Sequence, residues 1–390
     1  MENFTFCSPT RFEFGRGTEA KAGELCKLYG ATKVLVHFGG GSAVRSGLLD
    51  RVTESLKDAG LEYITLGGVQ PNPRSSLVYK GIDLARKEKV DFILAVGGGS
   101  VIDSAKAIAF GTLYEGDFWD FHEPKTPVKA ALPVGTVLTI PAAGSEGSYN
   151  CVITKDETLK KRGTNGECLL PKFSIMNPEL CATLPPYQTA SGVADIMAHV
   201  LERYFTPTKD VEITDRLCEA VLLTIVNEAP KLIADPADYQ ARANVMWAGM
   251  LAHNNSCGIG RVQDWTSHGL EHELSGLYDV AHGAGLAVIF PAWMEYVLKD
   301  GVDRLCQMAT RVFGISPDKE DPEKTARAGI EALRRFFKSL GLPSTLREMG
   351  AKEEDIPFMA ANMAYSKDGT YGGFVKLTCK DVENIFRLAY

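Results

Sequence analysis

The first half of the chain alternates compact apolar runs with amphipathic stretches. Apolar runs of a length that suits buried strands occupy residues 34–38, 63–69 and 91–96, and a further strand is expected early in 134–148. The stretches between them have helical spacing, one over about 44–59 with a stop at Gly60 and one over about 75–88 with a serine cap at Ser75. Because strands that alternate with helices pair in parallel through right-handed crossovers, this half predicts a parallel sheet covered by helices.

The pattern changes near residues 180–188, where the strand signals stop. After Pro186 no run predicts a convincing strand, and long amphipathic stretches predict helices, for example over 213–233, 239–254 and 326–340. We therefore expect an α/β domain over residues 1–183 and an all-helical domain over residues 184–390.

A length of 390 residues agrees with two domains of roughly 100–200 residues each. The composition, with 45% hydrophobic and 23% charged residues, is typical of a globular protein. A formal net charge of −7 argues against nucleic acid or an anionic membrane surface as a partner. No run approaches the ~20 apolar residues of a membrane span, and the first residues lack the basic and apolar segments of a secretory signal.

The nine cysteines are scattered and do not suggest a disulfide framework. Their number is odd, and no C-x-x-C pair occurs among them. Free thiols of this kind are typical of a reducing compartment, so we expect a cytoplasmic protein.

Glycine- and serine-rich loops follow three of the expected strands, at residues 39–42, 97–100 and 142–148. Such a loop lets backbone N–H groups approach a phosphate, and a helix that follows it adds favourable electrostatics. Neither the G-x-G-x-x-G fingerprint nor the P-loop pattern is present at these positions. Taken singly, each loop is better explained as a tight turn. Three of them at the ends of adjacent parallel strands favour nucleotide binding.

The helix expected after the second loop carries three polar side chains of interest. Ser100 is placed to cap it. Asp103 is compatible with an ordinary first-turn acid favoured by the helix dipole, and Lys106 is compatible with a solvated side chain. The functional alternative places Asp103 near the nicotinamide end of a bound dinucleotide.

The residues after the first strand bear on the choice of cofactor. Dehydrogenases that prefer NAD often carry an acid there, which bonds the ribose 2′-hydroxyl and repels a 2′-phosphate. Here Phe38 is followed by three glycines and Ser42, so no acid opposes a phosphate, and Ser42 with free backbone N–H groups is able to bind one. The sequence therefore predicts a preference for NADP(H).

Four side chains of the second half predict a metal site. Asp195 and His199 are four residues apart in a helical stretch and share one face, and His268 and His282 are able to join them from other segments. One oxygen and three nitrogens suit Fe²⁺ or Zn²⁺ better than Mg²⁺ or Ca²⁺. An acid–histidine pair on a helix also arises by chance, and spacing alone equally allows a pair of His268 and His272.

These motifs together resemble the iron-containing (group III) alcohol dehydrogenases, and within them most closely the NADP-dependent butanol dehydrogenases. The resemblance covers most of the chain. The matching stretches are GGGSVIDSAKAIA, the loop PAAGSEGS, NPELCATLPPYQTASGVADIMAHVLERYF and SHGLEHELSGLYDVAHGAGLAVIFPAWM. The pattern H-x-x-x-H-x-L-x-G-x-Y followed by A-H-G is far more specific than any of the glycine loops.

The resemblance implies a Rossmann-like dinucleotide-binding domain, similar to that of dehydroquinate synthases, followed by a helical metal-binding domain. It implies that Fe²⁺, or Zn²⁺ as a substitute, is held by Asp195, His199, His268 and His282. It leaves His272 beside the metal as a proton relay or substrate contact, although simple packing there is also possible. The residues implied to lie along the cofactor are Gly40, Gly41, Ser42, Gly97, Gly98, Ser100, Asp103, Thr139, Ser145 and Lys161.

The expected activity is reversible hydride transfer between NADP(H) and a small primary alcohol or aldehyde such as butanol or butanal. The resemblance also suggests a homodimer. Two alternatives stay open: a zinc enzyme of related fold that oxidises polyols, as glycerol dehydrogenases do, and a dinucleotide-binding redox sensor without catalysis.

Overall fold

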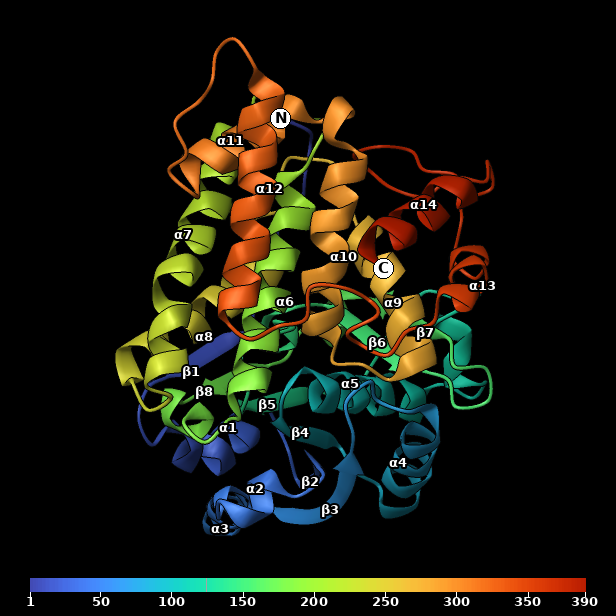
Figure 1. The fold of residues 1–390 in the computed structure, drawn as a ribbon. Helices are drawn as coiled ribbons and strands as arrows, with labels where there is room; N and C mark the ends of the chain where they lie inside the picture. The colour runs from blue at the N-terminus through green and yellow to red at the C-terminus, as the bar shows by residue number, and fades with distance from the viewer. Residues whose placement is uncertain (124) are drawn as a thin grey trace. The chain divides into compact units, whose positions relative to one another are not determined.

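A six-stranded parallel sheet organises residues 7–183 in the computed structural model, which describes residues 1–123 and 125–390 (Figure 1). The strand order is β1-β8-β5-β4-β2-β3, and every neighbouring pair is parallel. The strands are β1 (Arg11–Phe14), β2 (Lys33–Gly39), β3 (Glu62–Val69), β4 (Phe92–Gly97), β5 (Val134–Leu138) and β8 (Phe173–Met176). A separate antiparallel pair consists of β6 (Asn150–Thr154) and β7 (Lys161–Asn165).

Helices cover both faces of this sheet because its central strands are apolar on both sides. On one face, Val34, Val36 and Leu94 belong to a core that also includes α1 and α3. On the other face, the His37 ring bonds Ser104 of α5. The helices of this unit are α1 (Ala22–Leu28), α2 (Ser42–Arg45), α3 (Leu48–Asp58), α4 (Ser75–Glu88) and α5 (Gly99–Leu113).

Two details of the sequence prediction are wrong in this unit. The helix expected over 44–59 is divided into α2 and α3, because Gly47 has a left-handed backbone with φ of 69°. Ser75 and Ser100 are not N-caps, since α4 begins after Arg74 and α5 after Gly98. At α4 the carboxylate of Asp156 takes the capping role and accepts a hydrogen bond from the Ser76 backbone N–H at 2.8 Å.

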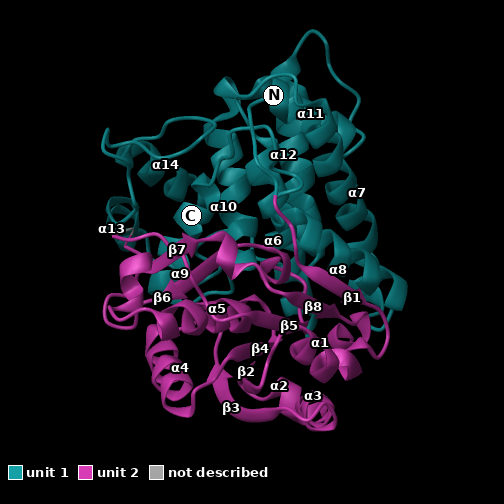
Figure 2. Cartoon of the chain, turned by 180° about the vertical axis from the view of Figure 1, so that it is seen from behind, with its two compact units in different colours: residues 1–6, 184–390 teal, residues 7–183 magenta. Residues whose placement is uncertain are grey.

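Helices build the second unit, residues 184–390 together with 1–6 (Figure 2). They are α6 (Pro186–Tyr204), α7 (Glu212–Ala234), α8 (Tyr239–His253), α9 (Thr266–Tyr278), α10 (His282–Tyr296), α11 (Val302–Arg311), α12 (Pro322–Ser339), α13 (Ile356–Ala361) and α14 (Cys379–Ala389). The described residues after 186 contain no β-strand, so the predicted fold class, an α/β region followed by an all-helical region, is confirmed. None of the described helices has the length and apolar character needed to cross a membrane.

The first six residues belong with this helical unit rather than with the α/β unit to which the sequence assigned them. The backbone N–H of Glu2 donates a hydrogen bond of 2.8 Å to the Gly260 carbonyl, and Gly260 lies close to the Met1 and Phe4 side chains. Contacts between segments so far apart in the chain leave no local pattern from which they can be predicted.

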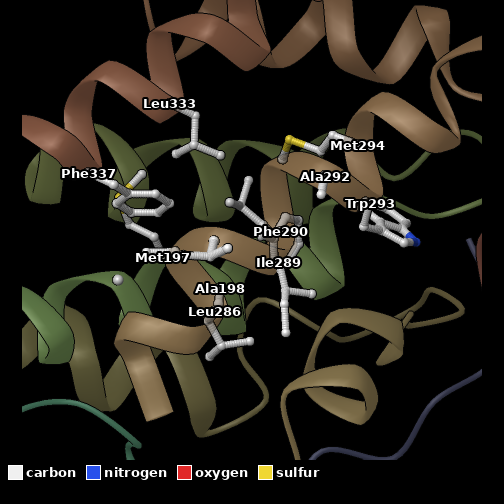
Figure 3. Close-up of a cluster of buried hydrophobic side chains, with 14 of the residues drawn as sticks. Met197, Ala198, Leu286, Ile289, Phe290, Ala292, Trp293, Met294, Leu333 and Phe337 are labelled. Atoms are coloured by element: carbon white, nitrogen blue, oxygen red, sulfur yellow. The ribbon is translucent and has the colours of Figure 1, made fainter. Parts of the chain in front are cut away.

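The core of the helical unit lies between α6, α10 and α12 (Figure 3). Met197 of α6, Phe290 of α10 and Phe337 of α12 are all within 2% of complete burial. Residues on every side of α10 are buried, as expected for a helix without a polar face at the centre of an all-α unit.

Gly283 allows α10 to approach α6 at the backbone itself. A Cβ atom on this residue would lie 1.8 Å from the carbonyl oxygen of Ser191 and 3.2 Å from the backbone nitrogen of Asp195. His282, the first residue of α10, is therefore carried to the part of α6 where Asp195 lies.

We predict that Gly283→Ala destabilises the helical unit, because the new methyl group collides with backbone rather than with a movable side chain. The expected cost is about 1–3 kcal/mol, which exceeds the roughly 1 kcal/mol that Ala ordinarily gains over Gly inside a helix. A thermal melt followed by circular dichroism measures it. Gly163→Ala is the control, since its nearest neighbour would lie at 3.7 Å. Equal melting temperatures for the two variants would contradict this account of the helix contact.

Candidate active site

Three helices of the second unit bring the four predicted metal ligands together. Asp195 and His199 lie on α6, His268 lies on α9, and His282 begins α10. From Asp195 Oδ1, the His199 Nδ1 atom is 3.3 Å away, His282 Nε2 is 3.6 Å away and His268 Nε2 is 3.9 Å away. Ligand atoms of Asp195, His268 and His282 all lie within 4.8 Å of one another. The His199 ring centre lies 4.6 Å from that of His268.

Two buried carboxylates, which the sequence did not predict as part of the site, bond Nδ1 of two of these imidazoles, the ring nitrogen other than the one near Asp195. Glu202 Oε1 lies 3.0 Å from His268 Nδ1 and also accepts a hydrogen bond from the His268 backbone N–H at 2.9 Å. Glu271 Oε2 bonds His282 Nδ1, and Glu271 Oε1 accepts from the Ser275 hydroxyl. Both glutamate side chains are completely buried. In the sequence, Asp195, His199 and Glu202 are spaced so that they share one face of α6, and His268 and Glu271 are three residues apart on α9. These two polar stripes are the sequence signal by which the glutamates could have been found.

Burial favours the neutral form of His199 and His268. It lowers the pKa of His199 well below its usual value, and the nearby Arg203 guanidinium lowers it further. Burial likewise lowers the pKa of His268, with the neighbouring histidines adding to the effect. Burial and then Asp264 raise the pKa of Glu202, whereas the hydrogen bond from the His268 backbone favours its charged form. Neutral imidazole is the form that binds a metal ion.

The residues at this centre fit a divalent metal ion. His199 Nδ1 and His268 Nε2 are buried and have no hydrogen-bond partner among the described residues, although both approach the Asp195 carboxylate. Buried polar atoms without partners are rare in folded proteins, and a bound ion or water satisfies such atoms. One carboxylate oxygen with imidazole nitrogens is a donor set for Fe²⁺ or Zn²⁺.

Aromatic and basic side chains surround the centre. The Trp265 ring centre lies 5.1 Å from that of His268, and the Arg203 guanidinium lies 4.7 Å from the Trp265 ring centre. His253 lies 4.1 Å from His199 between ring centres. His272 lies 5.6 Å from His282 between ring centres, and the two histidines form a second group of close ligand atoms with Glu271. His272 is thus beside the predicted metal ligands, as the family resemblance implied.

The predicted cofactor residues lie mainly at one edge of the parallel sheet, in the other unit. Residues 40–42 follow β2, residues 97–103 end β4 and begin α5, and Thr139 follows β5, whose neighbour in the sheet is β4. These are the carboxyl ends of three adjacent strands, the edge at which open α/β sheets bind ligands. Ser145 lies in a short 3-10 turn (Ser145–Gly147), and Lys161 begins β7.

Lys106 and Asp103 hold the 145–152 segment against α5. The Lys106 side chain is buried, not solvated as its position suggested, and its Nζ atom donates to the carbonyls of Ser145, Ser148 and Asn150 at 2.8–2.9 Å. Asp103 accepts hydrogen bonds from the Ser145 hydroxyl at 2.6 Å and from the Val152 backbone N–H at 2.9 Å. Burial lowers the pKa of Lys106, and the charge of Asp103 opposes this shift.

Close packing explains part of the glycine content of the 97–99 loop. A Cβ on Gly98 would lie 2.1 Å from Ile140 Cγ2, and one on Gly99 would lie 2.7 Å from Ala143 Cβ. The loop after β4 therefore has to be free of side chains where it meets the loop after β5. This requirement holds whether or not a phosphate binds there.

Comparisons with known proteins agree with this arrangement. Two family models match the chain, iron-containing alcohol dehydrogenase over residues 9–178 and the C-terminal region of the Fe-containing alcohol dehydrogenase family over residues 189–390. The chain is 42% identical to a probable NADH-dependent butanol dehydrogenase of Bacillus subtilis over 99% of both chains. It is 38% identical to the NADPH-dependent aldehyde reductase YqhD of Escherichia coli over 92% of both. The crystal structure of NADH-dependent butanol dehydrogenase A from Thermotoga maritima, 42% identical, superimposes with a TM-score of 0.96 and covers 100% of this chain and 99% of that one.

The chain belongs to the iron-containing alcohol dehydrogenase family. It is accordingly an oxidoreductase of alcohols and aldehydes that uses iron and a nicotinamide nucleotide, and the family resemblance drawn from the sequence is confirmed. The names of its relatives are divided between NADH and NADPH, so the predicted preference for NADP(H) stays a prediction.

We predict that Lys106→Met weakens nucleotide binding, because it removes the donor that holds three carbonyls of the 145–150 segment. Hydrogen bonds to a charged group contribute about 1.5–3 kcal/mol, so the Kd for NADPH should rise about tenfold or more. Titration of NADPH fluorescence measures this. The exposed Lys80 on α4 provides the control variant Lys80→Met. An unchanged Kd in folded Lys106→Met protein would show that this ammonium has no part in shaping the loop.

Proposed function

We propose that this protein transfers hydride reversibly between NADP(H) and a small primary alcohol or aldehyde such as butanol or butanal. The observation that carries the proposal is the convergence of Asp195, His268 and His282 within 4.8 Å, with His199 against the same carboxylate. Relatives named butanol dehydrogenase and aldehyde reductase, each similar over most of its length, support the substrate class. A homodimer in the cytoplasm remains an expectation that rests on the family resemblance and on cysteine usage.

The four predicted ligands would hold iron, with zinc as a substitute. A divalent ion there supplies a Lewis acid that polarises a carbonyl or lowers the pKa of an alcohol. The protein's own contribution is to keep His199 and His268 neutral by burial and to hold His268 and His282 with their Nε2 atoms toward Asp195. The Trp265 ring adds an apolar surface next to His268 and His199.

NADP(H) supplies the hydride chemistry, and the α/β unit would bind and orient it. Asp103 and Lys106 fix the 145–152 segment, and the loops at 40–42 and 97–100 would receive the phosphates through backbone N–H groups. Alcohol oxidation also releases a proton. His272, half-exposed beside His282, would hold that proton at a ring nitrogen and pass it to solvent.

The proposed preference for NADP(H) rests on the turn after β2. No acidic residue follows Phe38 in this turn, and Ser42 lies at its end. The exposed Arg45 directs its guanidinium back over the turn, since Nη1 would lie 3.0 Å from a Cβ on Gly41. A guanidinium and a serine hydroxyl are suitable partners for a 2′-phosphate.

We predict that His268→Ala abolishes both metal retention and turnover while nucleotide binding persists. The substitution removes one donor from the centre, whereas the nucleotide-binding loops lie in the other unit. Elemental analysis of anaerobically purified protein and the butanal-dependent oxidation of NADPH measure the two effects, and NADPH fluorescence tests binding. Butanal reduction at the wild-type rate by metal-free protein would end the proposal. Activity with glycerol and NAD alone would favour a polyol enzyme instead.

We predict a higher kcat/KM with NADPH than with NADH, and a loss of that preference in Arg45→Gln. Because the removed charge would face only the 2′-phosphate, KM for NADPH should rise about tenfold while the constants for NADH stay unchanged. Steady-state kinetics with butanal and each nucleotide measure this. A wild-type preference for NADH, or equal changes with both nucleotides, would contradict the assignment.

A further inference from the structure

Two imidazoles of the centre turn the same ring nitrogen, Nε2, toward the Asp195 carboxylate. His268 Nδ1 faces Glu202 and His282 Nδ1 faces Glu271, so in a neutral ring each Nδ1 carries the hydrogen that the glutamate accepts. Each Nε2 atom then presents a lone pair, and both Nε2 atoms point at the Asp195 carboxylate, which is itself an acceptor. Lone pairs facing one another repel unless a positive ion lies between them.

The same arrangement explains why two carboxylates lie completely buried among the helices. A buried carboxylate costs several kcal/mol unless it is well paired, and the carboxylates of Glu202 and Glu271 lie against the Nδ1 atoms of His268 and His282. A cation bound at Nε2 polarises the ring and strengthens the bond that Nδ1 donates to the glutamate. The glutamate oxygen that accepts from Nδ1 thus keeps each ring in the orientation in which Nε2 faces the cation.

We infer that Glu202 and Glu271 are positioning residues that fix His268 and His282 as Nε2 ligands and thereby set the affinity for the metal. This inference rests on the proposed metal centre. It assigns the effect to the reach and direction of each glutamate oxygen rather than to its negative charge. Glu202 is itself fixed, because one oxygen accepts from both the ring and the backbone of His268, and Glu271 is fixed by Ser275 one turn away on α9.

Two substitutions at each of Glu202 and Glu271 separate the effect of side-chain length from the effect of negative charge. Glu202→Gln and Glu271→Gln keep an oxygen at the same distance and lose the charge. Glu202→Asp and Glu271→Asp keep the charge and are too short to reach Nδ1. The control is Glu219→Asp, a buried glutamate of the same unit whose carboxylate bonds Tyr204 and Arg216.

The experiment titrates metal-depleted full-length protein with Co²⁺, which takes the place of iron and has visible absorption bands that report coordination. A competing chelator gives the Kd, and circular dichroism confirms that each variant is folded. We expect the two Asp variants to raise the Kd 10–100-fold. The Gln variants and Glu219→Asp should stay within about threefold of the wild type, well inside the tenfold that 1.4 kcal/mol represents.

The outcomes distinguish this inference from the proposed function. Asp variants that bind Co²⁺ as the wild type does, or Gln variants as weak as the Asp variants, overturn the positioning role while leaving the metal centre in place. Wild-type protein that binds no Co²⁺, or that binds it unchanged after His268→Ala, overturns the metal centre and the inference with it.

Discussion

The candidate site of the helical unit depends on the contact of α6 and α10 at Gly283. Only a residue without a side chain lets the start of α10 reach the backbone of Ser191, and this places His282 near Asp195, one turn further along α6. His268 joins them from α9, which packs against α10. Once these helices are packed, burial keeps His199 and His268 neutral, and Glu202 and Glu271 determine which ring nitrogen of His268 and His282 faces Asp195. Packing comes first, and protonation and orientation follow from it.

Hydrophobic periodicity predicted much of the fold because the elements concerned have clear patterns. The strand expected at 34–38 and the helix expected over 75–88 are present as β2 and α4 with almost the same bounds. Two of its failures had as their causes a single backbone conformation and a distant partner. Gly47 bends the chain between α2 and α3, and Asp156, which caps α4, is contributed by a segment about 80 residues further along. Apolar spacing contains no information about either.

The residues of the candidate site were likewise predicted from local pattern only in part. Asp195 and His199 could be paired from helical spacing alone, whereas the choice of His282 over His272 came from the resemblance to a family. The structure brings both histidines near His268 and gives His282 the Nε2 atom directed at Asp195. Glu202 and Glu271 went unnoticed because an acid on a helix is usually a surface residue, and only complete burial shows that it needs a partner. Lys106 was misjudged for the same reason.

The residues of the proposed metal centre come from distant parts of the chain, and this affects how the protein folds. Glu202 and His268, which form one of its bonds, are 66 residues apart, and α7 and α8 lie between them in the sequence. Asp195 and His199 lie on α6, whereas His268 and His282 lie on α9 and α10, so the complete set of four predicted ligands assembles only after distant helices have docked. A metal ion that binds the native arrangement and not the unfolded chain shifts the folding equilibrium toward the native state by mass action. The supply of iron in the cell would then govern the persistence of the folded enzyme as well as its catalysis.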